Sequence, residues 1–185
     1  MSSAPVGENT TAGKILYMIV TAFVLMLDQF TKYWAAIVLS EGEEIHIIEG
    51  LLKFSYTENP GIAFGMLGDG SLRWALVGVS VAAITIVTFY LMRTPSSNIL
   101  LLWSLSLLAA GICGNLIDRI RLGRVIDFIE VYYRSYHFPV FNVADTAITI
   151  GAALMAIELF LTPTPSQATT DEQSESPITE PINDE

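Results

Sequence analysis

Residues 111–149 read GICGNLIDRIRLGRVIDFIEVYYRSYHFPVFNVADTAIT, and this stretch decides the fold. Two strongly apolar segments meet in it, and polar side chains gather at or near their ends. These are three aspartates, two asparagines and one arginine: Asp118, Asp127, Asp145, Asn115, Asn142 and Arg119. An ionisable group at the edge of a membrane segment is energetically costly and is a functional hypothesis by default. We therefore expect an active site at the membrane surface, built on two carboxylates.

The composition favours a membrane protein over a soluble globule. The chain has 185 residues, of which 52% are hydrophobic and only 15% charged, and its mean hydropathy is +0.52. The net charge of −10 falls to −4 without the six acids of the last fifteen residues, so the charge does not indicate a nucleic acid partner. The single cysteine excludes an intramolecular disulfide.

Outward from this stretch, apolar runs of roughly 20 residues predict four membrane helices. We expect an all-α membrane protein with helices over 14–39, 72–92, 99–119 and 140–161. Between the last two helices, residues 120–138 are predicted to form a loop or short helix that could move as a lid.

Residues 40–71 differ from the helices. Leu52, Phe54 and Tyr56 alternate with polar residues, a period of two that predicts a strand. We expect a small antiparallel sheet, a β-cradle over about 45–66, with a turn over 57–61.

Both ends of the chain are polar. Residues 1–13 and the acidic segment 162–185 are predicted to be disordered, because neither can bury an apolar core. The domain prediction is therefore a membrane domain over 14–161 with one tail on each side.

Consecutive membrane helices alternate in direction, which places the acids together. The end of the third helix and the start of the fourth share a membrane face, so Asp118 and Asp145 lie on one side, with Asp127 in the connection between them. The end of the first helix, near Asp28, lies on that side too. Asp28 and Lys32 are spaced i, i+4, and we expect Asp28 to point into the bundle.

Paired carboxylates suit acid–base chemistry. Two adjacent carboxyl groups share one proton, so the ionised member can deprotonate a water while the protonated member polarises a carbonyl. Spacing alone does not decide which two of the three aspartates form the pair. Arg119 follows Asp118 directly and should hold it ionised as a structural ion pair, which favours Asp127 and Asp145.

Other chemistries fit less well. Cys113 has no nearby histidine, and His46 and His137 lack the spacing of zinc ligands. We expect neither a metal nor a cofactor.

Five blocks carry a resemblance to a known family, and they occur in the family's order: Asp28-Gln-Phe-Thr-Lys32, Asn59-Pro-Gly-Ile-Ala-Phe-Gly65, Gly114-Asn-Leu-Ile-Asp-Arg119, Val125-Ile-Asp-Phe128 and Phe141-Asn-Val-Ala-Asp145. The chain resembles bacterial lipoprotein signal peptidase (signal peptidase II) over about 15–161. The acidic tail lies outside the resemblance.

The resemblance implies an aspartic endopeptidase that uses no metal. Such an enzyme cuts diacylglyceryl-modified prolipoproteins before the lipid-bearing cysteine, and globomycin inhibits it. The implied dyad is Asp127 and Asp145. Supporting or substrate-lining positions are Asp28, Asn59, Asn115, Asp118, Arg119 and Asn142. Its partners would be the lipidated precursor and membrane lipids, and we expect a monomer.

Charge and resemblance disagree on orientation. Seven of the nine Lys and Arg residues lie on the face of the expected site, and only Lys14 and Arg93 on the other. The positive-inside rule would therefore place the site in the cytoplasm. The resemblance implies the bacterial inner membrane, an extracytoplasmic site and two cytoplasmic termini, and we follow it because several of these cations belong to the motifs.

Three other functions fit parts of the sequence less well. A small ion- or proton-coupled transporter would spread polar groups through the depth of several helices, whereas here they gather at one face. A non-catalytic membrane subunit would use its polar stripes only to hold helices together. A presenilin-type protease would carry a Gly-x-Gly-Asp motif, which the sequence lacks.

Overall fold

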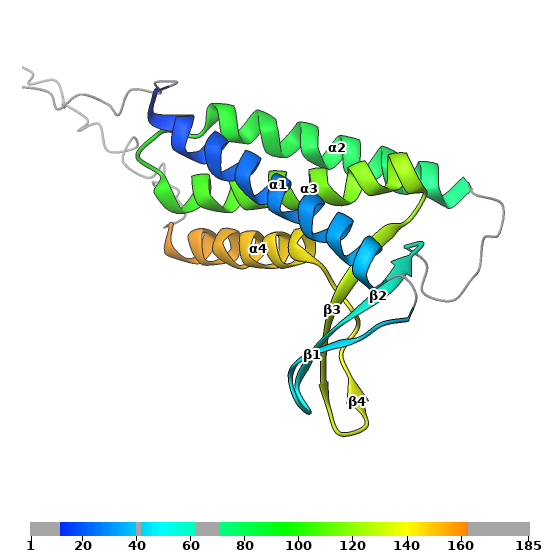
Figure 1. Cartoon of the computed structure of the whole chain (residues 1–185). Helices are drawn as coiled ribbons and strands as arrows, with labels where there is room; N and C mark the ends of the chain where they lie inside the picture. Colours follow the sequence, from blue (N-terminus) through cyan, green and yellow to red (C-terminus); the bar gives the residue numbers. More distant parts are fainter. Residues whose placement is uncertain (1–11, 40–41, 62–70, 163–185) are drawn as a thin grey trace, which may run out of the picture.

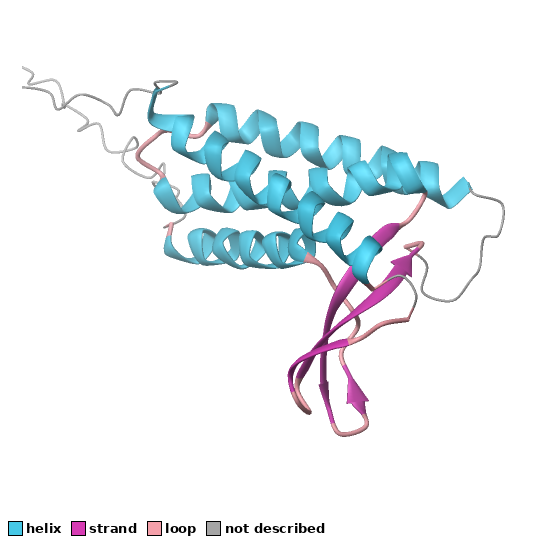
Figure 2. Ribbon diagram, in the orientation of Figure 1, coloured by secondary structure: helices cyan, strands magenta, loops and turns pink. Residues whose placement is uncertain are grey.

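The computed structural model describes residues 12–39, 42–61 and 71–162. Along the chain the elements are a 3-10 turn (Ala12–Lys14), α1 (Ile15–Val38), β1 (Ile45–Ile48), β2 (Leu52–Asn59), α2 (Ser71–Arg93), α3 (Ile99–Leu122), β3 (Val125–Tyr133), β4 (Tyr136–His137) and α4 (Val143–Leu161). The four helices lie side by side, and the strands project from one end of the bundle (Figure 1). Figure 2 shows this division into a helical layer and a sheet.

All four helices are long and apolar enough to cross a membrane. Large apolar side chains on their outer faces are exposed, for example Met26 and Phe30 of α1 at 63% and 67%. Such a surface is stable in lipid and would aggregate in water. The predicted fold class, four membrane helices with a small sheet, is confirmed.

α3 is the central helix. It packs against α1, α2 and α4, whereas α3 is the one helix that α2 approaches closely by backbone in the described part of the chain. Small residues bring α3 and α4 close together: the Ser104 hydroxyl donates to the Gly151 carbonyl over 2.8 Å. Close backbone approach at small residues is the usual way membrane helices associate, because lipid supplies no hydrophobic drive.

The sheet is antiparallel with the strand order β1-β2-β3-β4. It is joined to the bundle by an aromatic cluster in which Trp34 of α1 meets Phe54 of β2 and Phe128 of β3, with ring centroids 5.7 and 6.4 Å away. This cluster seats the start of β3 against the end of the bundle where α1 and α3 finish and α4 begins (Figure 1).

Two local predictions were wrong. The connection after α3 is neither loop nor short helix but the nine-residue strand β3, which supplies the third strand of the sheet. Its first four residues are all buried, so it lacks the alternation that reveals a half-exposed strand. The turn predicted over 57–61 starts later, because β2 continues to Asn59, whose side-chain oxygen accepts from the Gly61 amide at 2.8 Å.

The observed helix boundaries differ slightly from the predicted ones, and each difference has a local cause. α3 runs three residues past its predicted end and stops at Gly123, whose φ of +78° is accessible to glycine. α4 starts three residues later than predicted because Asn142 caps it. Most of the two predicted tails (1–11 and 163–185), and residues 62–66 of the predicted cradle, lie outside the described residues.

Replacing Gly114 by Ala should destabilise the bundle. A Cβ at Gly114 would collide with the Asp28 carboxylate, which is fixed in a buried cluster and cannot move aside. We expect a loss of about 1–3 kcal/mol, as for other overpacked cores. Gly78 of α2 is the matched control, because a Cβ there meets nothing within 4 Å. Gly78→Ala should leave stability unchanged or raise it. Thermal unfolding in detergent measures both, and equal melting temperatures would contradict the expectation.

Candidate active site

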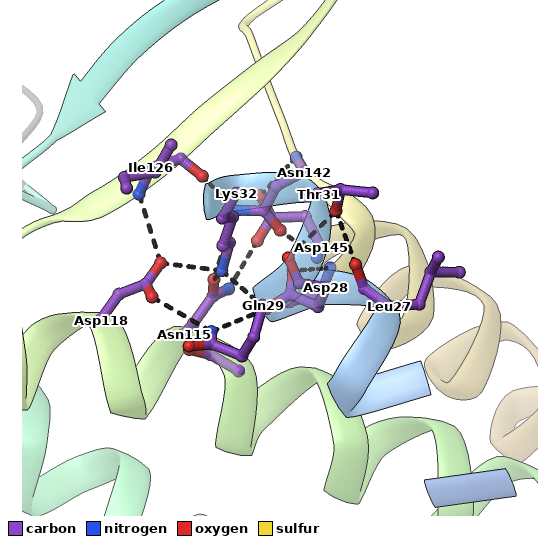
Figure 3. Close-up of polar contacts among 12 residues, drawn as sticks. Leu27, Asp28, Gln29, Thr31, Lys32, Asn115, Asp118, Ile126, Asn142 and Asp145 are labelled. Atoms are coloured by element: carbon purple, nitrogen blue, oxygen red, sulfur yellow. Dashed lines mark hydrogen bonds and ion pairs between the residues drawn. The ribbon is translucent and has the colours of Figure 1, made fainter. Parts of the chain in front are cut away.

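The predicted polar residues gather where the end of α3, the start of α4, β3 and the later part of α1 meet. Figure 3 shows many of these side chains pointing toward one another from α1, α3 and α4, beside the start of β3. Most are buried, so their hydrogen bonds must be made within the protein. They form two linked groups: a pair of carboxylates next to the sheet, and an ion cluster beneath it.

Asp127 is the buried member of the carboxylate pair, at 2% exposure. It lies in β3 opposite Thr57 of β2. Its Oδ1 accepts a hydrogen bond from Asn142 Nδ2 at 2.6 Å, and its Oδ2 accepts one from Asn59 Nδ2 at 2.9 Å. Asn59 reaches it because β2 and β3 are paired up to Asn59 and Val125.

Asp145 lies in the first turn of α4 and is partly exposed. Its Oδ1 accepts from Asn115 Nδ2 at 2.8 Å, and its Oδ2 accepts from the backbone amide of Asn142 at 3.2 Å. The Asn142 side chain in turn accepts from the Asp145 amide at 2.8 Å, which completes a capping box. The cap that starts the helix therefore also fixes the orientation of this carboxylate.

Asn142 connects the two carboxylates. Its side-chain nitrogen donates to Asp127, while its backbone amide donates to Asp145. The same nitrogen lies 3.3 Å from Asn115 Oδ1 and 3.2 Å from the Ile126 carbonyl. One fully buried asparagine thus holds β3, α3 and the start of α4 in one arrangement.

Beneath the pair lies an ion cluster around Lys32 of α1. Its Nζ is 3.0 Å from Asp28 Oδ2 and 2.9 Å from Asp118 Oδ2, and it donates to Asn115 Oδ1 at 2.9 Å. Lys32 is 2% exposed and Asp28 is fully buried. A buried charge requires such partners, because an unpaired one would cost several kcal/mol.

The ion pair predicted between Asp118 and Arg119 is not formed. Asp118 pairs with Lys32, and within the described chain the Arg119 guanidinium makes no ion pair: its Nη1 donates to the Asn115 carbonyl at 3.3 Å. Residues adjacent in a helix point in different directions, so sequence neighbours rarely face each other. Asp118 also accepts from the Ile126 amide at 3.3 Å, which places β3 next to Asp127.

Asp28 points into the bundle, as expected, and holds α4 in place. Its Oδ1 accepts from the Ala144 amide at 2.9 Å, an N–H of the first turn that has no partner within the helix. Gln29, which the sequence did not single out, donates to the Asp28 and Asp118 carboxylates at 3.2 and 3.1 Å. The i, i+4 spacing of Asp28 and Lys32 indicates their ion pair in the sequence. No sequence pattern indicates the role of Gln29.

The pKa of Asp127 is raised to about 6, chiefly by burial and in part by the charge of Asp145. Hydrogen bonds from Asn59 and Asn142 and the charge of Lys32 oppose the shift. A carboxyl group that titrates near neutrality can hold or release a proton under working conditions. The partly exposed Asp145 beside it is available to water. This combination is the one that an acid–base carboxylate pair needs.

A shallow groove of about 350 Å³ borders the pair. It is lined by Phe138, Phe141, Asp145, Thr146, Thr149 and Ile150, so it is largely apolar with one carboxylate at its edge. Within the described residues, no group of three or more His, Cys, Asp or Glu side chains has the arrangement of a metal site.

Comparison with known proteins gives one family. The family model described as Signal peptidase (SPase) II matches residues 20–161. The lipoprotein signal peptidase of Syntrophus aciditrophicus (strain SB) is 40% identical over 148 residues, covering 78% of this chain and 92% of the relative. That of Geobacter sulfurreducens (strain ATCC 51573 / DSM 12127 / PCA) is 42% identical over 152 residues, covering 79% and 94%.

A solved structure described as a bacterial membrane enzyme is also similar, with a TM-score of 0.71 and 31% identity over 80% of this chain and 94% of that one. The family model covers more than half of the chain and the relatives match over most of their own lengths, so the resemblance seen in the five sequence blocks is confirmed. The chain belongs to the signal peptidase II family.

Proposed function

We propose that this protein is an aspartic endopeptidase that removes signal peptides from diacylglyceryl-modified prolipoproteins, cutting before the lipid-modified cysteine. Family membership supports the peptidase activity and the prolipoprotein substrate. The observation that carries the aspartic mechanism is the pairing of Asp127 with Asp145 through Asn142. Asp28 and Asp118, which are also buried near the pair, are engaged by Lys32 and are not available for proton exchange.

In the proposed reaction the partly exposed Asp145 is ionised and takes a proton from a water molecule. The water oxygen attacks the carbonyl carbon of the scissile peptide. Protonated Asp127 donates a hydrogen bond to the carbonyl oxygen and stabilises the negative charge that develops there. The tetrahedral intermediate then re-forms the carbonyl and breaks its C–N bond, while Asp145 passes the proton it took from water to the leaving amine nitrogen. The raised pKa of Asp127 supports its assignment as the protonated member.

The supporting residues divide into two sets. Asn59, Asn115 and Asn142 orient the two carboxylates directly. Asp28 and Asp118 act from a distance, through the Ala144 and Ile126 amides. Arg119 contacts neither carboxylate in the described structure, so its proposed role is to face the substrate.

The apolar groove beside Asp145 suits a lipidated peptide. Its aromatic and aliphatic lining can bury acyl or signal-peptide side chains, while Asp145 at the edge faces the polar backbone. Globomycin-type inhibitors would compete for this groove, and no cofactor takes part. A monomer is sufficient for this chemistry, since every residue of the pair comes from one chain.

The transporter alternative gains no support. A relay would need polar side chains along the depth of the helices, whereas the ion cluster and the carboxylates lie together near the end of α3 and the start of α4. The family and the similar membrane enzyme agree with a multi-pass membrane protein. We further propose an inner-membrane location with the sheet and the site outside and both termini in the cytoplasm. A reporter fused after Glu185 and assayed on each side of the membrane tests this orientation.

The function is tested with purified protein and a synthetic diacylglyceryl precursor in detergent. We expect cleavage before the modified cysteine, at least about 100-fold slower cleavage of the same peptide without its lipid, and no effect of a metal chelator. Cleavage that requires an added metal, or that is equally fast for the peptide with and without its lipid, would contradict the proposal. The chromatographic separation of the released signal peptide measures the rate.

The pH profile should follow Asp127. If protonated Asp127 is required, activity falls as pH rises through its pKa, so the alkaline limb of kcat/KM should have an apparent pKa of about 6. Asn59→Leu removes a hydrogen bond that stabilises the ionised form, so the limb should move to higher pH. Glu58→Gln, at the neighbouring position and away from the pair, is the control. A limb that is unmoved by Asn59→Leu would assign the proton to another group.

A further inference from the structure

A groove on the lipid-facing side of the bundle lies apart from the carboxylate pair. α2 and α4 both pack on α3 but make no backbone contact with each other in the described structure, so a strip of α3 between them stays open. The cavity has a volume of about 670 Å³. Leu105 and Ile112 belong to its floor, and Ile86 of α2 forms part of one wall.

One end of this groove is polar. Asn98, the N-cap of α3, meets Glu158 and Thr162 at the end of α4. Asn98 Nδ2 donates to Glu158 Oε1 at 2.9 Å, and the Thr162 hydroxyl donates to the same oxygen at 3.0 Å. Within the described residues no donor reaches Glu158 Oε2. Glu158 is therefore an oriented carboxylate with one oxygen left for a ligand, and the proposed peptidase reaction makes no use of it.

The dimensions of the groove fit a chain rather than a helix. Asn98 and Ile112 are separated by about 21 Å along the α3 axis, which is more than the roughly 15 Å of one leaflet of hydrocarbon. A volume of about 670 Å³ spread over that length corresponds to a channel about 9 Å across, once the radius of a water molecule at each wall is included. A helix with its side chains needs about 10–12 Å. A lipid acyl chain fits, whereas a transmembrane helix does not.

The charge at the polar end favours a cationic head group. The last turn of α4 contains no basic residue, and the C-terminal end of a helix itself carries a partial negative charge. Lys14 and Arg93 lie at the same end of the bundle, so the distinction between head groups is made at Glu158 itself. An ammonium group could donate to Glu158 Oε2 in a charge-assisted hydrogen bond, whereas phosphatidylglycerol has no ammonium group.

We propose that this groove binds a phospholipid with an ethanolamine head group. One acyl chain lies on α3 between α2 and α4, and the ammonium group binds Glu158. The lipid fills the space that these two helices leave open and stabilises their packing on α3. The site is at the end of the bundle opposite the sheet (Figure 1), so it is separate from the groove beside Asp145.

Native mass spectrometry of the full chain in neutral detergent tests this proposal. The protein is given equal amounts of phosphatidylethanolamine and phosphatidylglycerol with the same acyl chains. We expect the ethanolamine lipid to be retained at least about fivefold more strongly, which corresponds to a single charge-assisted contact. Glu158→Gln should reduce that ratio to about one, whereas Glu49→Gln on the β1–β2 turn should leave it unchanged.

A second pair of variants tests the groove itself. Ile86→Trp narrows the channel, while Ile19→Trp places the same side chain on the outer face of α1; the two isoleucines are 57% and 58% exposed. Only Ile86→Trp should lower lipid retention. Equal retention of both lipids by the unaltered protein, an unchanged ratio in Glu158→Gln, or no effect of Ile86→Trp would overturn the proposal. So would a stable dimer that buries Ile86, because a second copy would then occupy the groove. Unimpaired peptide cleavage by Glu158→Gln separates this site from the proposed peptidase site.

Discussion

Asp127→Asn should lower kcat for precursor cleavage at least about 10⁴-fold, because asparagine can neither carry the shared proton nor release it. The protein should still fold. Burial raises the pKa of Asp127 to about 6, so ionising this group costs stability as pH rises through that value. The neutral asparagine avoids this cost. At pH 8 the melting temperature of the variant should therefore equal or exceed that of the unaltered protein, whereas at pH 4 the substitution should not raise it.

Glu130→Gln is the matched control for this loss. Glu130 lies on the same strand and is also buried, but it binds His137, Ser55 and Lys53 on a different part of the sheet. Replacing it should keep the cleavage rate within about threefold of that of the unaltered protein, as expected for a group outside the reacting centre. If Asp127→Asn still processes a lipidated precursor at a comparable rate, the pair does not perform the reaction.

Lys32→Met should destabilise the protein by about 3–5 kcal/mol, the usual cost of removing one partner of a buried ion cluster. Asp28 and Asp118 would lose their only cationic partner among the described residues, and Asn115 would lose a donor that fixes it against Asp145. Thermal unfolding in detergent measures the loss. Cleavage should fall in parallel, because the Asn115 amide is no longer held.

Two comparisons make the Lys32 result specific. Arg124 pairs with Glu58 at 2.8 Å, but both side chains are exposed, at 51% and 36%. Arg124→Met should therefore cost less than about 1 kcal/mol. Adding Asp118→Asn to Lys32→Met removes one unpaired carboxylate and should recover part of the stability. A Lys32→Met protein as stable as Arg124→Met would show that the cluster is hydrated rather than buried.

The helices were predictable because the bilayer sets their length. Each predicted span overlaps its observed helix with boundaries displaced by three residues or fewer, and the displacements at Gly123 and Asn142 reflect caps that hydropathy does not register. The polar stripes of α3 and α4 also placed Asn115, Asp118, Asn142 and Asp145 at one membrane end, where the structure has them. The choice of Asp127 and Asp145 came from the resemblance, since spacing alone left three aspartates open.

The missed features depend on contacts between distant segments. β3 was not predicted because its buried start reads as a continuous apolar run with one acid. Asp118 was assigned to its neighbour Arg119, but its partner is Lys32, which reaches it from another helix. Gln29 donates to Gly114 and Asp118, 85 and 89 positions away, as well as to its neighbour Asp28. Such pairings follow from how helices pack, which no local pattern in one sequence specifies.

The bond from the Ala144 amide to Asp28 joins the first helix of the bundle to the last, across 116 positions of the chain. At about 5–20 residues per second, a ribosome takes roughly 6–23 s to synthesise the intervening stretch. During that interval Asp28 has no helix to cap, and neither Asn142 nor Asp145 has been translated. Under the proposed mechanism the nascent polypeptide is therefore inert toward peptides while it is inserted into the bilayer, and cleavage becomes possible only once the last helix is in place.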